Sequence, residues 1–91
     1  MYFSNLESFK QVVDNAKKIC VEVTLTDGNV IVSSGVPIEV MPSVFEDMEA
    51  FWLNKDSFSV WMHVSDGLRS EGKVETFAYP CVRSIAVRIF K

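Results

Sequence analysis

The clearest pattern along the chain is an alternation of apolar and polar residues that starts at Ile19. Its apolar positions are Ile19, Val21, Val23 and Leu25, and the residues between them are Cys20, Glu22 and Thr24. A period of two is typical of a β-strand with one buried face. Asp27-Gly28 follows, and such a pair supplies the positive φ angles of a tight type I′ turn. We therefore predict a β-hairpin over residues 19–34.

The apolar residues also predict the register of this hairpin. A two-residue turn puts the apolar sets of both strands on one face, with Leu25 opposite Val30, Val23 opposite Val32 and Val21 opposite Ser34. A shift of one residue would move the valines of the second strand to the other face, because side chains alternate between faces. The sequence thus predicts a well-specified register.

A helical pattern precedes the hairpin. Apolar residues recur at helical spacing at Leu6, Phe9, Val12, Val13 and Ala16. Ser4 and Glu7 have the spacing of a capping box. Lys17 and Lys18 lie near the opposite end, where positive charge is favoured. These residues predict a first helix over residues 5–17.

The segment after the hairpin has two interpretations. Ile38 to Met41 can form a short strand that ends before Pro42. Ser43 and Glu46 form a second capping-box spacing, and a helical stripe follows at Val44, Phe45, Met48, Phe51 and Trp52. Arranged as a strand, these residues would mix apolar and charged side chains on both faces. We therefore predict a short helix over residues 43–53.

Alternation returns from Ser57 to Val64. One face carries Phe58, Val60, Met62 and Val64, and the other carries Ser59, Trp61 and His63. A two-residue turn at the second Asp-Gly pair would put Val64 opposite Arg69 and Met62 opposite Glu71, which is a poor match. We predict instead a longer, mobile polar loop from Ser65 to Gly72.

Two further strands complete the pattern. Lys73 to Tyr79 has Val74 and Phe77 as apolar anchors, and Pro80 ends it. The last strand, Val82 to Phe90, carries Ile85, Val87 and Ile89 on one side and Val82, Ala86 and Phe90 on the other. A strand that is apolar on both sides is expected to be covered twice, by the sheet interior and by a helix.

Length and composition fit a single domain. The chain has 91 residues, of which 48% are hydrophobic, so a core can form without disulfides or metals. We predict one α+β domain over residues 1–91: an N-terminal helix, a strongly bent and mostly antiparallel sheet of about five strands, and the short helix at 43–53.

The cysteines and the N-terminus indicate the compartment. Cys20 and Cys81 can form a bridge only if the fold brings them together, and we interpret them instead as buried small hydrophobes in a reduced cytoplasm. The N-terminus lacks the basic flank and apolar run of a secretory signal, and no apolar stretch approaches the ~20 residues that span a bilayer. We expect a soluble, cytoplasmic protein without a membrane partner.

Charge is unevenly distributed along the chain. The net charge is −3, with eight acids and one base from Cys20 to Asp66, and five bases and two acids from Gly67 to Lys91. One interpretation is ordinary solvated faces. The other is an acidic surface around Glu39 to Glu49, with Glu46, Asp47 and Glu49 at its centre, that docks on a basic partner.

Residues for catalysis or metal binding are few. His63 is the one histidine and could act as a base toward Cys20 or Cys81, but no motif supports such a pair. Neither zinc-ligand spacing, nor a calcium loop, nor a glycine-rich phosphate cradle is present in the sequence. We predict no catalytic residues, no metal and no cofactor.

Aromatic residues are concentrated in one stretch. Phe45, Phe51, Trp52, Phe58 and Trp61 fall within seventeen residues, and core packing explains four of them. Trp61 is the exception, because it lies on the face opposite Phe58 and would be an exposed partner anchor or a base-stacking platform. Arg83 and Arg88 could contact phosphate, but their odd and even positions place them on opposite faces of one strand.

The run VEVTLTDGNVIV within Cys20 to Val32 resembles the opening hairpin of Sm-like and related SH3-like small β-barrels. The preceding helix and a closing strand such as Val82 to Val87 are similar to that architecture, so the resemblance covers about half of the chain with generic motifs. It implies a small-barrel-like sheet. The departure is Pro42 to Leu53, where such a barrel continues through strands. Sm-like domains mostly bind RNA or form rings, and some small acidic relatives occupy a nucleic-acid-binding protein.

These observations lead to a preferred function and two alternatives. We predict a non-catalytic binding or regulatory module that acts through a protein partner, as an acidic inhibitor or as a homodimer, with Glu46, Asp47, Glu49 and Trp61 as partner-binding residues. The alternative is an Sm-like RNA- or DNA-binding small barrel that uses Trp61, Arg83 and Arg88. A small enzyme is the third interpretation.

Overall fold

The computed structural model describes residues 2–65 and 70–90, with the side chains of all of these except 15, 63–65, 70 and 71. The helices and strands are β1 (Tyr2–Phe3), α1 (Leu6–Lys10), β2 (Lys18–Leu25), β3 (Val30–Val32), α2 (Met41–Asn54), β4 (Ser57–Ser65), β5 (Ser70–Ala78) and β6 (Val82–Phe90). Short 3-10 helices cover Val13–Asn15, Ile38–Val40 and Tyr79–Cys81.

The strands form two antiparallel sheets. The first has the order β1-β6-β2-β3 and the second consists of β4 and β5. The Ser34 amide, just beyond β3, donates to the Trp61 carbonyl of β4 at 3.1 Å and links the two sheets. The predicted α+β class is confirmed, and the strands are not closed into a barrel.

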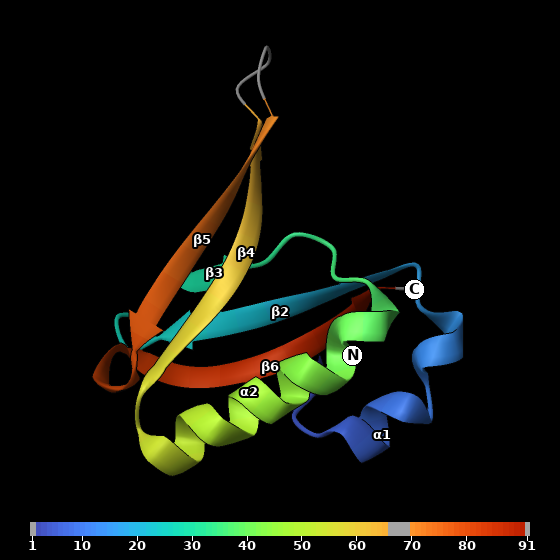
Figure 1. Ribbon diagram of the computed structural model, residues 1–91, viewed down its shortest axis with the longest axis horizontal. Coiled ribbons are helices and arrows are strands. Elements are labelled where there is room, and N and C mark those ends of the chain that lie inside the picture. Colours follow the sequence, from blue (N-terminus) through green and yellow to red (C-terminus); the bar gives the residue numbers. More distant parts are fainter. Residues whose placement is uncertain (1, 66–69, 91) are drawn as a thin grey trace.

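Helix α2 covers one face of the four-stranded sheet (Figure 1). Its buried side chains, Met41, Phe45, Met48 and Phe51, join one continuous core with the inward residues of β2 and β6. Phe9 of α1 enters the same core and lies 5.4 Å from Phe45 between ring centroids. Burial of this apolar stripe accounts for the position of α2, because an amphipathic helix is stable when its apolar side is covered.

The predicted register of the first hairpin is wrong by one residue. The observed pairs are Glu22 with Val32, Val23 with Ile31 and Thr24 with Val30. The loop has three residues, because the Leu25 amide donates to the Asn29 carbonyl and the Gly28 amide to the Leu25 carbonyl. Within this loop only Gly28 takes a positive φ, of 93°, whereas a type I′ turn would force Asp27 into a positive φ too.

The first helix is shorter than predicted. It ends at Lys10, and its N-cap is Asn5, whose Oδ1 accepts from the Ser8 amide at 2.9 Å. The β-branched pair Val12 and Val13 and the turn-forming Asp14 disfavour further helix. Val12, Val13 and Ala16 nevertheless pack against the core, so the apolar spacing identified buried residues correctly in a segment that is not one helix.

The predicted strand from Ile38 to Met41 is also wrong. Ile38–Val40 is a 3-10 helix that leads into α2, and Pro42 lies in the first turn of α2. Proline is tolerated there because the first amides of a helix have no partner within the helix. The helix predicted over residues 43–53 is confirmed within α2, and Lys55 ends it in the left-handed conformation with φ 53°.

The second hairpin is longer than predicted. Ser65, Ser70 and Gly72, assigned to a loop, belong to β4 and β5, with Ser65 opposite Ser70 and His63 opposite Gly72. Residues 66–69, the centre of the predicted mobile loop, lie outside the described residues. On the last strand, Ile85, Val87 and Ile89 are buried, whereas Ala86 and Phe90 on the other side are only partly covered.

Candidate functional site

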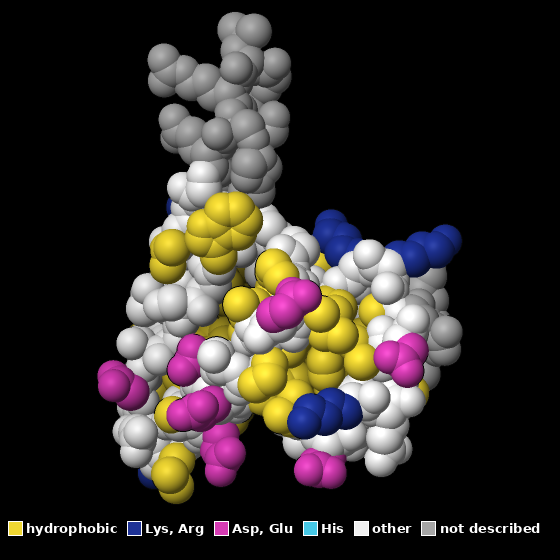
Figure 2. Space-filling view, turned by 45° about the vertical axis from the view of Figure 1, so that its right-hand side comes forward, with side chains coloured by type: hydrophobic (Ala, Val, Ile, Leu, Met, Phe, Trp, Pro, Cys, Tyr) yellow, Lys and Arg dark blue, Asp and Glu magenta, His cyan; other side chains and the backbone are white. Residues whose placement is uncertain are grey.

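A groove runs between the beginning of α1 and the outer side of α2. It encloses about 800 Å³, and its lining is Ser4, Asn5, Leu6, Pro42, Phe45, Glu46, Met48, Glu49, Trp52 and Leu53. Six of these side chains are apolar and two are acidic. Figure 2 shows hydrophobic side chains gathered on this side of the molecule, with acidic side chains over α2 beside them.

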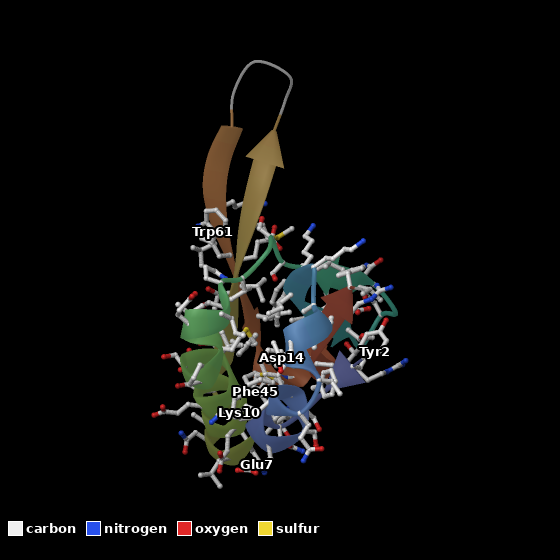
Figure 3. The ribbon with its side chains drawn as sticks, turned by 90° about the vertical axis from the view of Figure 1, so that its right-hand side faces the viewer. Tyr2, Glu7, Lys10, Asp14, Phe45 and Trp61 are labelled. Carbon is white, nitrogen blue, oxygen red and sulfur yellow. The ribbon has the colours of Figure 1, made fainter. Side chains whose placement is uncertain are left out.

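The sequence of α2 explains this lining. Phe45, Met48 and Trp52 recur at helical spacing and form the floor of the groove, while Glu46 and Glu49, three residues apart, lie on one side of the helix and form its rim. Phe45 lies between α2 and α1 (Figure 3). Trp52 is 38% exposed and Leu53 is 77% exposed, whereas Phe45 and Met48 are buried, so the apolar area that the groove presents to solvent comes from Trp52 and Leu53.

The predicted acidic residues divide between two hollows. Glu46 and Glu49 line the groove, whereas Asp47 lies on the opposite side of α2. There it borders a smaller hollow of about 290 Å³ that Trp61 also lines. The structure therefore brings Glu46 together with Glu49, and Asp47 together with Trp61, but does not place all four residues around one site.

Trp61 is half exposed, as its position in the alternating pattern predicts. It pairs with Val74 across β4 and β5, and its indole covers Gly72. A Cβ added at Gly72 would lie 2.9 Å from the indole Cζ2. Glycine is therefore the residue that allows the indole to lie this close to the backbone of β5.

Arg83 and Arg88 lie at separate places on β6. The Arg88 guanidinium lies 4.4 Å from the Phe90 ring centroid and 5.4 Å from that of Tyr2, within the range of cation–π attraction. Its Nη1 is 3.9 Å from Glu22 Oε2. That oxygen is buried and has no hydrogen-bond partner among the described residues. Arg88 is thus held on the outer face of the four-stranded sheet.

A β-bulge changes the expected position of Arg83. The pairing of β2 with β6 shifts between Thr24 and Leu25, so Arg83 has no partner of its own on β2. Arg83 and Ser84 are both exposed between buried Val82 and Ile85, and strict alternation would not allow this. The prediction of opposite faces therefore fails at the bulge. Trp61, on the second sheet, is not brought together with the two arginines.

The two cysteines differ in environment. Cys20 is fully buried, as predicted, whereas Cys81 is exposed, and both are free thiols. Burial raises the pKa of the Cys20 thiol above its ordinary value, which lowers its thiolate fraction at neutral pH. The side chain of His63 lies outside the described residues. Within the described ranges, no three metal-ligating side chains come together.

We expect iodoacetamide to modify Cys81 of the native protein quickly and Cys20 only after unfolding. The physical reason is that Cys20 combines complete burial with a raised pKa, and alkylation requires an accessible thiolate. Peptide mass spectrometry after timed labelling measures both rates. A Cys81→Ser variant should leave one slow site, and equal labelling of both cysteines in the wild type would contradict the expectation.

The groove residues Leu6, Trp52 and Leu53 were not predicted as site residues from the sequence. Leu6 was named only as part of the first helical pattern, Trp52 was assigned to the core with the other aromatic residues of its stretch, and Leu53 had no assigned role. The available indication was that Trp52 and Leu53 extend the apolar stripe of α2 toward Glu46 and Glu49. Whether such residues are covered depends on what packs beside α2, and the beginning of α1 lines the groove without covering Trp52 and Leu53.

In the part of the chain that the structure describes, no helix has the length and apolar character to cross a membrane. No family model, no curated protein and no solved structure matches the chain.

Proposed function

We propose that this chain is a non-catalytic module that binds a basic, amphipathic segment of a protein partner in the groove between α1 and α2. The observation that supports the proposal is an apolar groove with a rim of two carboxylates, Glu46 and Glu49, and with Trp52 and Leu53 exposed to solvent. By occupying a basic segment, the module would act on its partner as an inhibitor or regulator.

The chemistry of the groove defines the expected ligand. Apolar side chains of the ligand would replace water over Trp52 and Leu53, since exposed apolar area and aromatic anchors supply most of the binding energy at such sites. Lysine or arginine residues of the ligand would lie beside Glu46 and Glu49, which favours correct partners and rapid association. An amphipathic helix with basic flanks has both features.

A designed peptide tests the proposal. The probe is a fluorescein-labelled helical peptide with leucines at i, i+3, i+4 and i+7 and lysines beside them, and titration by fluorescence anisotropy measures its affinity. We expect Glu46→Lys/Glu49→Lys to weaken binding at least about tenfold, because two attractive contacts become repulsive. A matched control, Asp14→Lys/Asp56→Lys, changes the net charge equally at exposed positions outside the groove.

Two results would contradict this function. Equal loss of binding in the control variant would mean that only net charge matters, and absence of binding to the wild type would exclude this ligand class. For the nucleic-acid alternative, the decisive result is tight oligonucleotide binding with steep salt dependence in a low-salt gel shift.

A further inference from the structure

β5 is an edge strand with one side unpaired. Among the described residues it pairs with β4 alone, and the two strands extend beyond the four-stranded sheet (Figure 1). The Tyr79 amide donates to the Asp56 carbonyl at 3.0 Å. Hydrogen-bonded pairs recur at every second residue along an antiparallel ladder. Counting back from Tyr79, the amides and carbonyls of Glu75 and Lys73 therefore point toward β4. Gly72, Val74 and Thr76 therefore present their amides and carbonyls to the unpaired side.

The two faces of β5 carry different side chains. Lys73 and Glu75 share one face, where Lys73 Nζ lies 2.6 Å from Glu75 Oε1. Val74 lies on the other face and is 61% exposed. Trp61 pairs with Val74 across the hairpin, and its indole reaches over Gly72 toward the unpaired side. An exposed strand edge with apolar neighbours is a template for pairing with another strand.

We propose that β5 pairs in antiparallel orientation with β5 of a second copy of this chain, about a two-fold axis through Val74. In this register Lys73 faces the partner's Glu75, and Glu75 faces the partner's Lys73. The strand is therefore complementary to itself in charge. Opposite charges across an antiparallel pair stabilise it, whereas like charges oppose pairing.

The backbone and the outer face fit the same register. Val74 would exchange two hydrogen bonds with the partner's Val74, and Gly72 would exchange two with the partner's Thr76, so the groups on the unpaired side gain partners. On the outer face, Trp61 and Val74 of each copy would form one apolar row across the axis. This self-association uses residues outside the groove and does not rest on the proposed function.

Charge reversal tests the register. The wild type should show concentration-dependent dimerisation in sedimentation velocity. Lys73→Glu gives an edge with two acids, and Glu75→Lys gives an edge with two bases, so each variant alone should bind itself at least about tenfold more weakly than wild type. An equimolar mixture of the two should restore dimerisation, because every 73–75 contact between unlike copies is then between opposite charges.

The mixture separates pairing between copies from the Lys73–Glu75 contact within one chain, since that contact is lost in both variants. Glu46→Lys, which changes the groove, serves as the control and should dimerise like the wild type. A monomeric wild type at millimolar concentration would overturn the proposal. The charges of Lys73 and Glu75 would then be features that prevent pairing at this edge. Failure of the mixture to dimerise would equally overturn it, because the proposed register requires heterodimers.

Discussion

Replacing Phe51 with alanine is expected to lower the free energy of unfolding by about 3–5 kcal/mol, the usual cost of removing a buried phenylalanine ring. Phe51 is 1% exposed and stands where α2, β4 and the turn before β6 meet. Its ring centroid lies 5.9 Å from that of Phe58, 5.5 Å from that of Tyr79 and 4.8 Å from that of Trp52. The cavity left by alanine would remove contacts on several sides at once.

Urea denaturation followed by circular dichroism measures this effect. A 91-residue domain is expected to have only about 5–14 kcal/mol of stability, so the midpoint should fall by a large fraction and the melting temperature by roughly 15 °C or more. Leu53→Ala is the matched control, because Leu53 lies on the same helix and is 77% exposed. Its stability should change by less than about 0.5 kcal/mol. Similar losses in the two variants would contradict the assigned core.

Ser33→Ala is expected to cost about 1–3 kcal/mol, although it removes a single oxygen atom. Ser33 is the buried polar side chain of the described core, and its hydroxyl accepts from the Val21 amide at 2.8 Å and donates to the Ser34 carbonyl at 2.9 Å. The hydroxyl thus takes the place of a backbone carbonyl in the pairing of β2 with the chain after β3. Alanine would leave a buried amide without a partner, which costs more than a lost exposed hydrogen bond.

Hydrogen exchange provides a local measurement of the same effect. The Val21 amide should exchange faster in Ser33→Ala than in the wild type, beyond the change that global destabilisation produces. Ser43→Ala, an exposed position in the first turns of α2, should leave both stability and exchange at Val21 unchanged. If Ser33→Ala matched Ser43→Ala in stability, the hydroxyl would not be required by the sheet.

Prediction from the sequence was most successful where one side of an element is buried and the other faces solvent. The helix at residues 43–53, the strands beginning at Ile19 and Ser57 and the exposure of Trp61 all follow from periodicity. Periodicity reports burial, which dominates the free energy of such elements. For the same reason the apolar spacing of Phe9, Val12 and Val13 marks residues that pack in or against the core, although the helix ends at Lys10.

Prediction of the site was partial for a related reason. Glu46 and Glu49 follow from the acidic pattern of α2, but the groove exists because the beginning of α1 lies beside that side of α2. Asp47 borders a different hollow from Glu46 and Glu49, and this separation likewise depends on which element lies against each side of α2. Sequence spacing gives the angle of a side chain around its own helix and carries no information about what lies opposite.

The sequence by itself determined the α+β class, the main helix, the alternating strands and the charges that β5 and α2 expose. Only the tertiary structure decided the register of the first hairpin, because Asp27-Gly28 is compatible with two loop lengths. The three-residue loop avoids a positive φ at Asp27 and leaves Val30 and Val32 exposed at 48% and 37%. Ile31 and Ser33 then lie opposite the buried residues Val23 and Val21. A local apolar pattern identifies which residues prefer burial. The backbone geometry of the turn and the hydrogen bonds of the whole sheet determine which of these residues are buried in the folded protein.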